Sequence, residues 1–422
     1  MSEQYRLTKV QTELLHIMEA FMEGKTEYAL PDTIDGKALE ELYRLSAVHK
    51  IASIVYEMIW RAPQLSGEES VLLAMRWKQM ALRDVMMQVQ RTEGFLRLYR
   101  RLCDNGLKPL VVKGIVCRNL YAKPDYRVSG DEDVLLRPEE FEACDRIMRE
   151  EGFQRKELPA EGLPHEVPYL NSKNGVYIEL HLSLFPEESG AYGHLNREFV
   201  GVHDRCICEK IQGTKVWTLH PTDHLYYLIC HSFKHFLHSG FGIRQVSDIM
   251  MLAKHYGEQI DWAYIAGRLK ELRMDMFFCG LLQIGERYLG MSGKEIGISD
   301  EITWPGTDCS ALLMDLLDSG IFGDSSMERK HSSNMTLAAV KKGKKDTVAS
   351  LGSSLFPSIS YMKRGYPWLE RYPWLLPTAW IMRCIQYLKR GKHGSRLGNE
   401  EENSVEIGMN RVELLRQYHI ID

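Results

Sequence analysis

The sequence lacks any hydrophobic run long enough to cross a bilayer. No stretch of about 18 consecutive apolar residues occurs in it. Residues 1–24 alternate polar and apolar side chains at helical spacing, without the uninterrupted apolar core of a signal peptide. The sequence also lacks a large excess of charge of one sign, because the formal net charge of the 422-residue chain is only −4. This balance gives no overall attraction to nucleic acid, so we expect no long nucleic acid as a partner.

Paired cysteine motifs are missing as well. The nine cysteines are an odd number, and most of them lie within apolar periodic segments. Cys206 and Cys208 form a single CxC without the second pair that a structural zinc site needs. We therefore expect reduced thiols and a cytoplasmic protein. The composition, 44% apolar and 26% charged, excludes disorder as the main state of the chain.

The pattern of apolar residues divides the chain into five expected parts. These are an N-terminal helical region (1–106), an α/β core (107–218), a helical domain (219–322), an exposed linker (323–347) and a C-terminal aromatic and basic helical arm (348–422). Apolar residues at three- and four-residue steps predict helices over 6–24, 37–62, 68–104, 243–256 and 261–291. The linker is rich in glycine, serine and lysine, which is typical of an exposed loop.

Three short stretches of the core predict β-strands. "KPLVVKG" (108–114) and "DEDVLLR" (131–137) are apolar runs bounded by turn residues, and a short helix over 115–121 separates them. In "GVYIELHLSLF" (175–185) apolar residues alternate with Tyr177, Glu179 and His181, as expected for a strand with one buried face. The predicted fold class is α+β, with a small mixed sheet between N-terminal and C-terminal helical regions.

Two aspartates stand one residue apart at the start of the second predicted strand. Side chains two apart on a strand point the same way, so Asp131 and Asp133 share one face and Glu132 lies on the other. If the later strand pairs nearby, Glu179 joins them. Carboxylates this close repel each other unless a cation lies between them, and oxygen ligands suit Mg²⁺ or Mn²⁺. The alternative interpretation is a solvated turn and an exposed strand carboxylate.

The turn at Lys113 and Gly114 comes just before the predicted short helix. Backbone N–H groups at such a turn bind anions, and a residue without a Cβ lets a phosphate approach. Arg127, four residues before Asp131, is a further candidate for neutralising phosphate charge. His181 shares a strand face with Glu179 and is a candidate for lining the site. For Lys113 and Arg127, a structural ion pair is the alternative.

The order of these elements resembles the nucleotidyltransferase superfamily typified by DNA polymerase β. The quoted stretch "LVVKGIVCRNLYAKPDYRVSGDEDVLL" followed by "YIELHLSLF" is most similar to a bacterial family of uncharacterised nucleotidyltransferases with the pattern KG, DxD and ExH. The core of the resemblance covers residues 108–186. It implies a transferase that moves a nucleoside monophosphate from a nucleoside triphosphate such as ATP to a hydroxyl acceptor, with release of pyrophosphate.

The resemblance also implies roles for individual residues. Asp131 and Asp133 would hold the metals, Mg²⁺ or Mn²⁺, and Glu179 would bind the catalytic metal and accept a proton from the attacking hydroxyl. Gly114 would let the triphosphate approach, beside Lys113. The chain departs from the wider superfamily at one position, because Ile115 follows Gly114 where a phosphate-binding serine is frequent. This departure leaves open a second hypothesis, a catalytically weak or inactive nucleotidyltransferase-fold protein that binds a nucleotide or another protein.

The acceptor stays open, because small molecules, sugars, proteins and RNA ends all suit the same core. A third reading is a zinc hydrolase, because His231 and His235 lie four residues apart in "HSFKHFLHSG". Ser232 stands where the glutamate of an HExxH motif would be, which disfavours this reading. Tryptophans and basic residues over 359–396 predict a packed helical arm, and peripheral contact with the inner face of the membrane is the alternative.

Overall fold

The structure is a computed structural model of the chain. It describes residues 6–67, 70–159, 162–238, 240–299, 302, 304–319, 336–337, 339–340, 359–362, 366–380, 382 and 408–421. The chain divides into two compact units. The larger comprises Met1–Phe233 and Gly242–Ile321, and the smaller comprises Lys234–Phe241 and Phe322–Asp422. All the candidate site residues discussed below lie in the larger unit.

The N-terminal region is helical, as predicted. Its helices are α1 (Lys9–Met22), α2 (Gly36–Val48), α3 (Ala52–Ile59) and α4 (Val71–Asp104). The single helix predicted over 37–62 is wrong, because the chain turns at Lys50, which has a φ of 55°. A left-handed residue ends a helix, so α2 and α3 become separate and pack against each other.

The sheet of the core is small and mixed, which confirms the α+β class. Its strands are β1 (Leu110–Val111), β2 (Glu132–Leu135), β3 (Glu166–Asn171) and β4 (Val176–His181). The strand order is β1-β2-β4-β3, in which β2 and β4 are parallel and the two outer pairs are antiparallel. A separate hairpin of β5 (Ile207–Ile211) and β6 (Thr214–Thr218) follows. Its two-residue turn has positive φ at both Gln212 and Gly213, as a tight hairpin turn requires.

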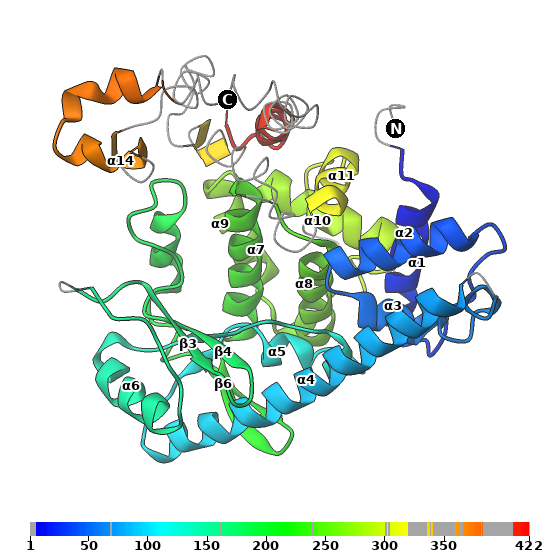
Figure 1. Ribbon diagram of the computed structural model, residues 1–422, viewed down its shortest axis with the longest axis horizontal. Coiled ribbons are helices and arrows are strands. Elements are labelled where there is room, and N and C mark those ends of the chain that lie inside the picture. Colours follow the sequence, from blue (N-terminus) through cyan, green and yellow to red (C-terminus); the bar gives the residue numbers. More distant parts are fainter. Residues whose placement is uncertain are drawn as a thin grey trace. The chain divides into compact units, whose positions relative to one another are not determined.

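Helices lie on both sides of this sheet (Figure 1). On one side runs α4, whose Gln88 and Thr92 contact the loop before β2 and the short helix α5 (Ile115–Arg118). On the other side stands α7 (Pro221–Leu237). The ring of its His224 contacts the carbonyl oxygen of Val112 at 2.9 Å, and burial lowers the pKa of this histidine to about 4. The strand ends that carry the acidic residues therefore lie between two helical layers.

Further helices of the larger unit lie before and after the hairpin in the sequence. They are α6 (Phe141–Glu150), α8 (Ile243–Tyr256), α9 (Trp262–Glu271), α10 (Asp275–Tyr288) and α11 (Ser310–Ser319), of which α6 precedes β3. The prediction for α8 is confirmed, whereas the single helix predicted over 261–291 is two helices. They separate at Arg273, which has a φ of 56°. Within the residues that the structure describes, no helix combines the length and apolarity needed to cross a membrane.

The smaller unit has its own apolar cluster. Met362, Leu369 and Ala379 are buried, and Trp368 and Trp380 pack against them. Trp374, in contrast, is 70% exposed. Two of the three tryptophans over 359–396 thus belong to a packed cluster, while most of the predicted linker and the basic end of the arm lie outside the described residues. Peripheral membrane contact through this segment stays a prediction.

Candidate active site

The pairing of β2 with β4 brings two of the predicted acids together. In the parallel register Asp133 lies opposite Glu179. Val176, Ile178 and Leu180 are at most 2% exposed, so the alternation predicted for this strand is confirmed and Glu179 faces the other way. The two carboxylates therefore share a sheet face, as the period of a strand requires once the register is known.

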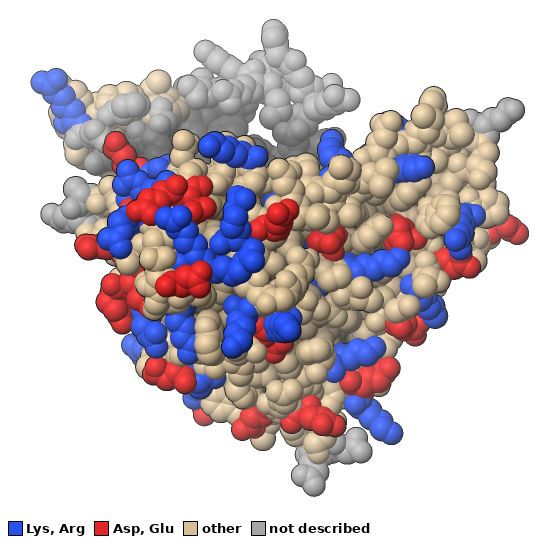
Figure 2. Space-filling view, turned by 90° about the horizontal axis from the view of Figure 1, so that it is seen from below, with Lys and Arg blue, Asp and Glu red and all other residues tan. Residues whose placement is uncertain are grey.

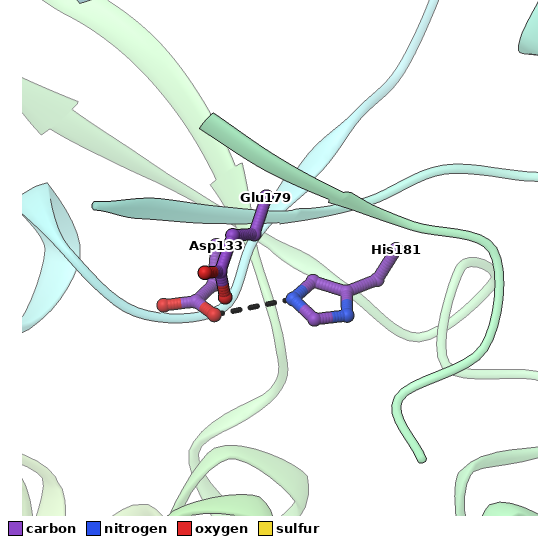
Figure 3. A group of neighbouring side chains, drawn as sticks. All are labelled: Asp133, Glu179 and His181. Carbon is purple, nitrogen blue, oxygen red and sulfur yellow. Dashed lines mark hydrogen bonds and ion pairs between the residues drawn. The ribbon is translucent and has the colours of Figure 1, made fainter. Parts of the chain in front are cut away.

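His181 completes a compact group with these two acids (Figure 3). Its Nε2 lies 3.1 Å from Oδ1 of Asp133. One ligand atom from each of Asp133, Glu179 and His181 lies within 4.8 Å of the other two, which is the arrangement of a candidate metal site. On its other side, the His181 ring reaches Glu166, with 3.8 Å between Nδ1 and the carboxylate. This distance is too long for a hydrogen bond, and Nδ1 of His181 has no hydrogen-bond partner among the described residues.

The site carries more negative than positive charge. Burial raises the pKa of Glu179 to about 8, and the charges of Asp133, Glu166 and Asp131 add to this shift. The nearest cation is Lys113, whose Nζ lies 3.9 Å from Oδ2 of Asp133. Asp133, Glu166 and Asp131 outweigh Lys113 in their effect on the pKa of Glu179, so the site favours a further cation.

Lys113 also contacts the helix that covers the site. Its Nζ lies 3.4 Å from Nε2 of His231 on α7. One turn earlier on the same helix, burial raises the pKa of Tyr227 well above its ordinary range, and the charges of Asp133 and Glu179 act in the same direction. The Tyr227 hydroxyl is buried and has no hydrogen-bond partner among the described residues. This hydroxyl lies close to the acids, and the water shell of a bound ion would give it a hydrogen-bond partner.

Asp131 lies at the edge of this arrangement. It precedes β2, is partly exposed, and is outside the group formed by Asp133, Glu179 and His181. Its charge nevertheless contributes to the raised pKa of Glu179, so the two carboxylates are near each other. A ligand role for Asp131 remains a prediction.

Glu132 lies on the opposite face of the strand, as predicted, and there it holds the Gly114 turn. Its carboxylate accepts hydrogen bonds from the backbone N–H of Ile115 and from the Arg118 guanidinium, both at 2.6 Å. Burial raises the pKa of Glu132, although Arg118 and the Ile115 amide act in the opposite direction. The amide expected to bind a phosphate is therefore already bonded to a carboxylate of the same chain. The approach of a triphosphate to Gly114 remains a prediction.

Gly114 is required at this turn for two reasons. Its φ is +66°, and a Cβ there would lie 2.0 Å from Oε2 of Glu132. We expect Gly114→Ala to lower the free energy of unfolding by at least about 2 kcal/mol, because such a backbone costs an L-residue about 1–3 kcal/mol and the clash adds to it. Urea denaturation would measure this loss.

Gly130 provides the control for that variant. It is an exposed glycine in the loop before β2, and a Cβ there would meet nothing within 4 Å. We expect Gly130→Ala to change the free energy of unfolding by less than about 1 kcal/mol. Equal effects of the two substitutions would show that the Gly114 turn is not held as described.

Arg127 is buried away from the acidic group. Its guanidinium forms a two-point ion pair with Asp248 on α8, and it is 1% exposed. Arg244 and Asp248 lie four residues apart in the sequence, a spacing that predicts a helix ion pair, but Arg244 donates to the carbonyl of Val128. Both arginines thus anchor the segment before β2 to α8. A phosphate contact for Arg127 remains a prediction.

Sequence reasoning did not identify Glu166 and Tyr227, and it considered His231 as a candidate zinc ligand. The sequence of β3 shows no clear alternation of apolar and polar residues, because its buried positions include Tyr169 and Asn171. The only signal for His231 and Tyr227 was a histidine- and tyrosine-rich helix without a metal motif. Their place beside Lys113 and the acids depends on how α7 packs on the sheet, which spacing does not encode.

Comparison with known proteins gives one match. The model of a family described as uncharacterised nucleotidyltransferase matches residues 35–290, which cover more than half of the chain. The match includes α4, the whole sheet and all residues of the site described above. No curated protein and no solved structure matches the chain significantly.

Proposed function

Because the chain belongs to the family of uncharacterised nucleotidyltransferases, we propose that it transfers a nucleoside monophosphate from a nucleoside triphosphate to a hydroxyl acceptor. The observation that carries this proposal is the group of Asp133, Glu179 and His181 on the paired strands β2 and β4. Such a group offers two carboxylates and an imidazole beside a single lysine, a donor set that suits a divalent cation.

The residues present fit a divalent metal. Asp133 and Glu179 would hold it, with His181 either as a ligand or as the group that orients Asp133, and Asp131 would contribute to a second ion. Mg²⁺ or Mn²⁺ would supply positive charge that stabilises the charge developing on the phosphate oxygens. The imidazole favours Mn²⁺ over Mg²⁺, because imidazole is a softer ligand than carboxylate.

The protein's own side chains would position the reactants. The acceptor oxygen forms a bond to the α-phosphorus while the bond from that phosphorus to the bridging oxygen breaks, and pyrophosphate leaves. Glu179 would accept the proton of the acceptor hydroxyl. Lys113, beside Asp133, would pair with a phosphate oxygen. We expect most of the rate enhancement to come from positioning and fixed charges.

A second candidate function is supported by the Gly114 turn. The Ile115 amide donates to Glu132, and Ile115 replaces the serine that often contacts phosphate. A protein with this turn would bind nucleotide weakly and would act as a nucleotide- or protein-binding module without transfer. This alternative keeps the metal group and the fold and differs only in whether transfer occurs.

Incubation with each α-labelled nucleoside triphosphate, Mg²⁺ or Mn²⁺ and cell extract tests the proposal. We expect label to move from the triphosphate to an acceptor, and the transfer to vanish in Asp131→Ala and Asp133→Ala. Transfer that survives both substitutions would refute the site. Binding of the labelled triphosphate without any transfer by the wild-type protein would favour the second candidate function.

The raised pKa of Glu179 predicts how pH acts on the metal-free protein. A carboxyl whose folded pKa is raised from 4.5 to about 8 stabilises the fold below pH 4.5, and this contribution is lost as the pH rises through 8. At pH 9, Glu179→Gln should therefore be more stable than the wild type by about 2 kcal/mol without metal. Urea denaturation at pH 6 and pH 9 measures both values.

Added Mn²⁺ should make the wild type the more stable of these two proteins at high pH. Mn²⁺ should raise the melting temperature of the wild type more at pH 8.5 than at pH 6, because a deprotonated Glu179 is the better ligand. Glu179→Gln should show little increase at either pH. An equal Mn²⁺ effect on the two proteins would remove Glu179 from the metal site.

A further inference from the structure

The exposed side of α4 carries a line of large apolar residues. Leu72, Met75, Leu82, Met86 and Val89 are between 47% and 71% exposed, and Leu72 and Met86 are the most exposed of them. An exposed apolar residue alone is ordinary, but a contiguous row on one helix marks a contact surface. Figure 2 looks from below onto the side of the molecule along which α4 runs in Figure 1, where basic and acidic side chains are interspersed with uncharged surface.

The spacing of these residues is that of a coiled-coil seam. They occupy steps of three and four, with Gln79 completing the row, so that Leu72, Gln79 and Met86 take position a of a heptad and Met75, Leu82 and Val89 take position d. The opposite side of the helix is buried through Leu73, Trp77 and Ala81. The seam, defined as positions a and d from 72 to 89, therefore lies on the exposed side of α4.

Three residues beside the seam are basic. Arg76 and Arg83 occupy position e and Lys78 occupies position g, and all three are exposed. The one acidic residue in this part of the helix, Asp84, is at position f, where it pairs with Arg83 at 3.7 Å. Charges at e and g select the partner of a coiled coil, so an acidic partner is favoured.

A second copy of this chain is a poor partner for the seam. In a parallel pair, Lys78 of one copy would face Arg83 of the other, and in an antiparallel pair the arginines at position e would meet. A bilayer is also disfavoured, because Gln79 interrupts the apolar row. A helix lying on a membrane buries a continuous apolar face.

We propose that the seam of α4 docks one amphipathic helix of a partner protein, with apolar residues at its own a and d positions and acidic residues at e and g. The proposal is independent of the catalytic assignment, because α4 presents the seam on the side away from its buried contacts. Gln79 would fix the register, as a single polar residue at position a does in other helix pairs.

A synthetic helix tests this surface with the full-length protein. The probe is a fluorescent three-heptad peptide with leucine at a and d and glutamate at e and g, and its counterpart carries lysine at e and g. We expect anisotropy titration to show at least tenfold tighter binding of the acidic peptide, with an affinity that falls as salt rises. Binding of neither peptide, or equal binding of both, would overturn the proposal.

Substitutions on the seam show where the peptide binds. Leu82→Gln with Met86→Gln should weaken binding of the acidic peptide at least tenfold, whereas Val200→Gln, at a 75% exposed valine elsewhere, should leave it unchanged. Arg76→Glu with Arg83→Glu should reverse the preference and favour the basic peptide. Circular dichroism would show whether the seam variants are folded. Unchanged peptide binding by folded seam variants would overturn the proposal.

Two further outcomes would replace the proposed partner with another. Sedimentation that shows a dimer of the wild type, lost in the seam variant, would mean that the seam joins two copies of the chain. Flotation with anionic vesicles, lost in the same variant, would mean that the seam contacts lipid. Either result would contradict docking of an acidic helix.

Discussion

Replacing Asp133 with asparagine is expected to lower nucleotidyl transfer by about 10³-fold or more. Asparagine keeps the shape of the side chain and its acceptor oxygen toward His181, but it removes the charge that pairs with Lys113 and would hold the metal. The expected loss is therefore chemical and not a failure to fold. It is measured as the rate of label transfer from an α-labelled triphosphate, with the melting temperature as a check on folding.

Glu142 on α6 offers a matched control for that substitution. It is an exposed acidic residue of the same unit, outside the site. Glu142→Gln should leave both the transfer rate and the stability unchanged. A transfer rate for Asp133→Asn within tenfold of the wild type would contradict the assignment of Asp133.

Asp248→Asn is expected to lower the free energy of unfolding by about 3–5 kcal/mol, because it leaves the buried Arg127 without its counterion. Burial by itself would raise the pKa of Asp248, but the charges of Arg127 and Arg244 and the hydrogen bonds from Arg127 and Tyr121 lower it below its ordinary value. Tyr121 donates to the same carboxylate at 2.9 Å. The substitution thus disturbs three partners at once, and urea denaturation at pH 7 measures its cost.

The pair of Arg44 and Glu40 provides the contrast. It has an N–O distance of 2.7 Å but is exposed on α2, so solvent screens it. Glu40→Gln should cost less than about 1 kcal/mol. If Asp248→Asn cost no more than Glu40→Gln, the anchoring of the segment before β2 to α8 would have to be reconsidered.

The sequence predicted the parts of the site that depend on local periodicity. Alternation along 175–185 placed Glu179 on the polar face of a strand, and the two-residue period placed Asp133 and Glu132 on opposite faces. Both features are present in β4 and β2. The class of the fold followed from the same patterns, because short apolar runs flanked by long periodic helices leave few other arrangements.

The contacts between distant elements could not be predicted in this way. The hydrogen bond from the Ile115 amide to Glu132 joins the Gly114 turn to strand β2 across 17 residues, and Arg127 reaches Asp248 across 121 residues. Local spacing suggested Arg244 as the partner of Asp248, but packing of α8 against the segment before β2 brought Arg127 closer. Helix breaks at Lys50 and Arg273 were missed because a left-handed lysine or arginine carries no sequence signal comparable to glycine.

The affinity of the protein for Mn²⁺ tests the central claim most directly, because the claim is that Asp133, Glu179 and His181 form a divalent metal centre. Titration of the full-length protein with Mn²⁺ at pH 8, followed by electron paramagnetic resonance of the free ion, measures it without any assumption about the acceptor. We predict saturable binding in the wild type that falls at least 100-fold in Asp133→Asn and is unchanged in Glu142→Gln. Equal Mn²⁺ affinity in all three proteins would contradict the account.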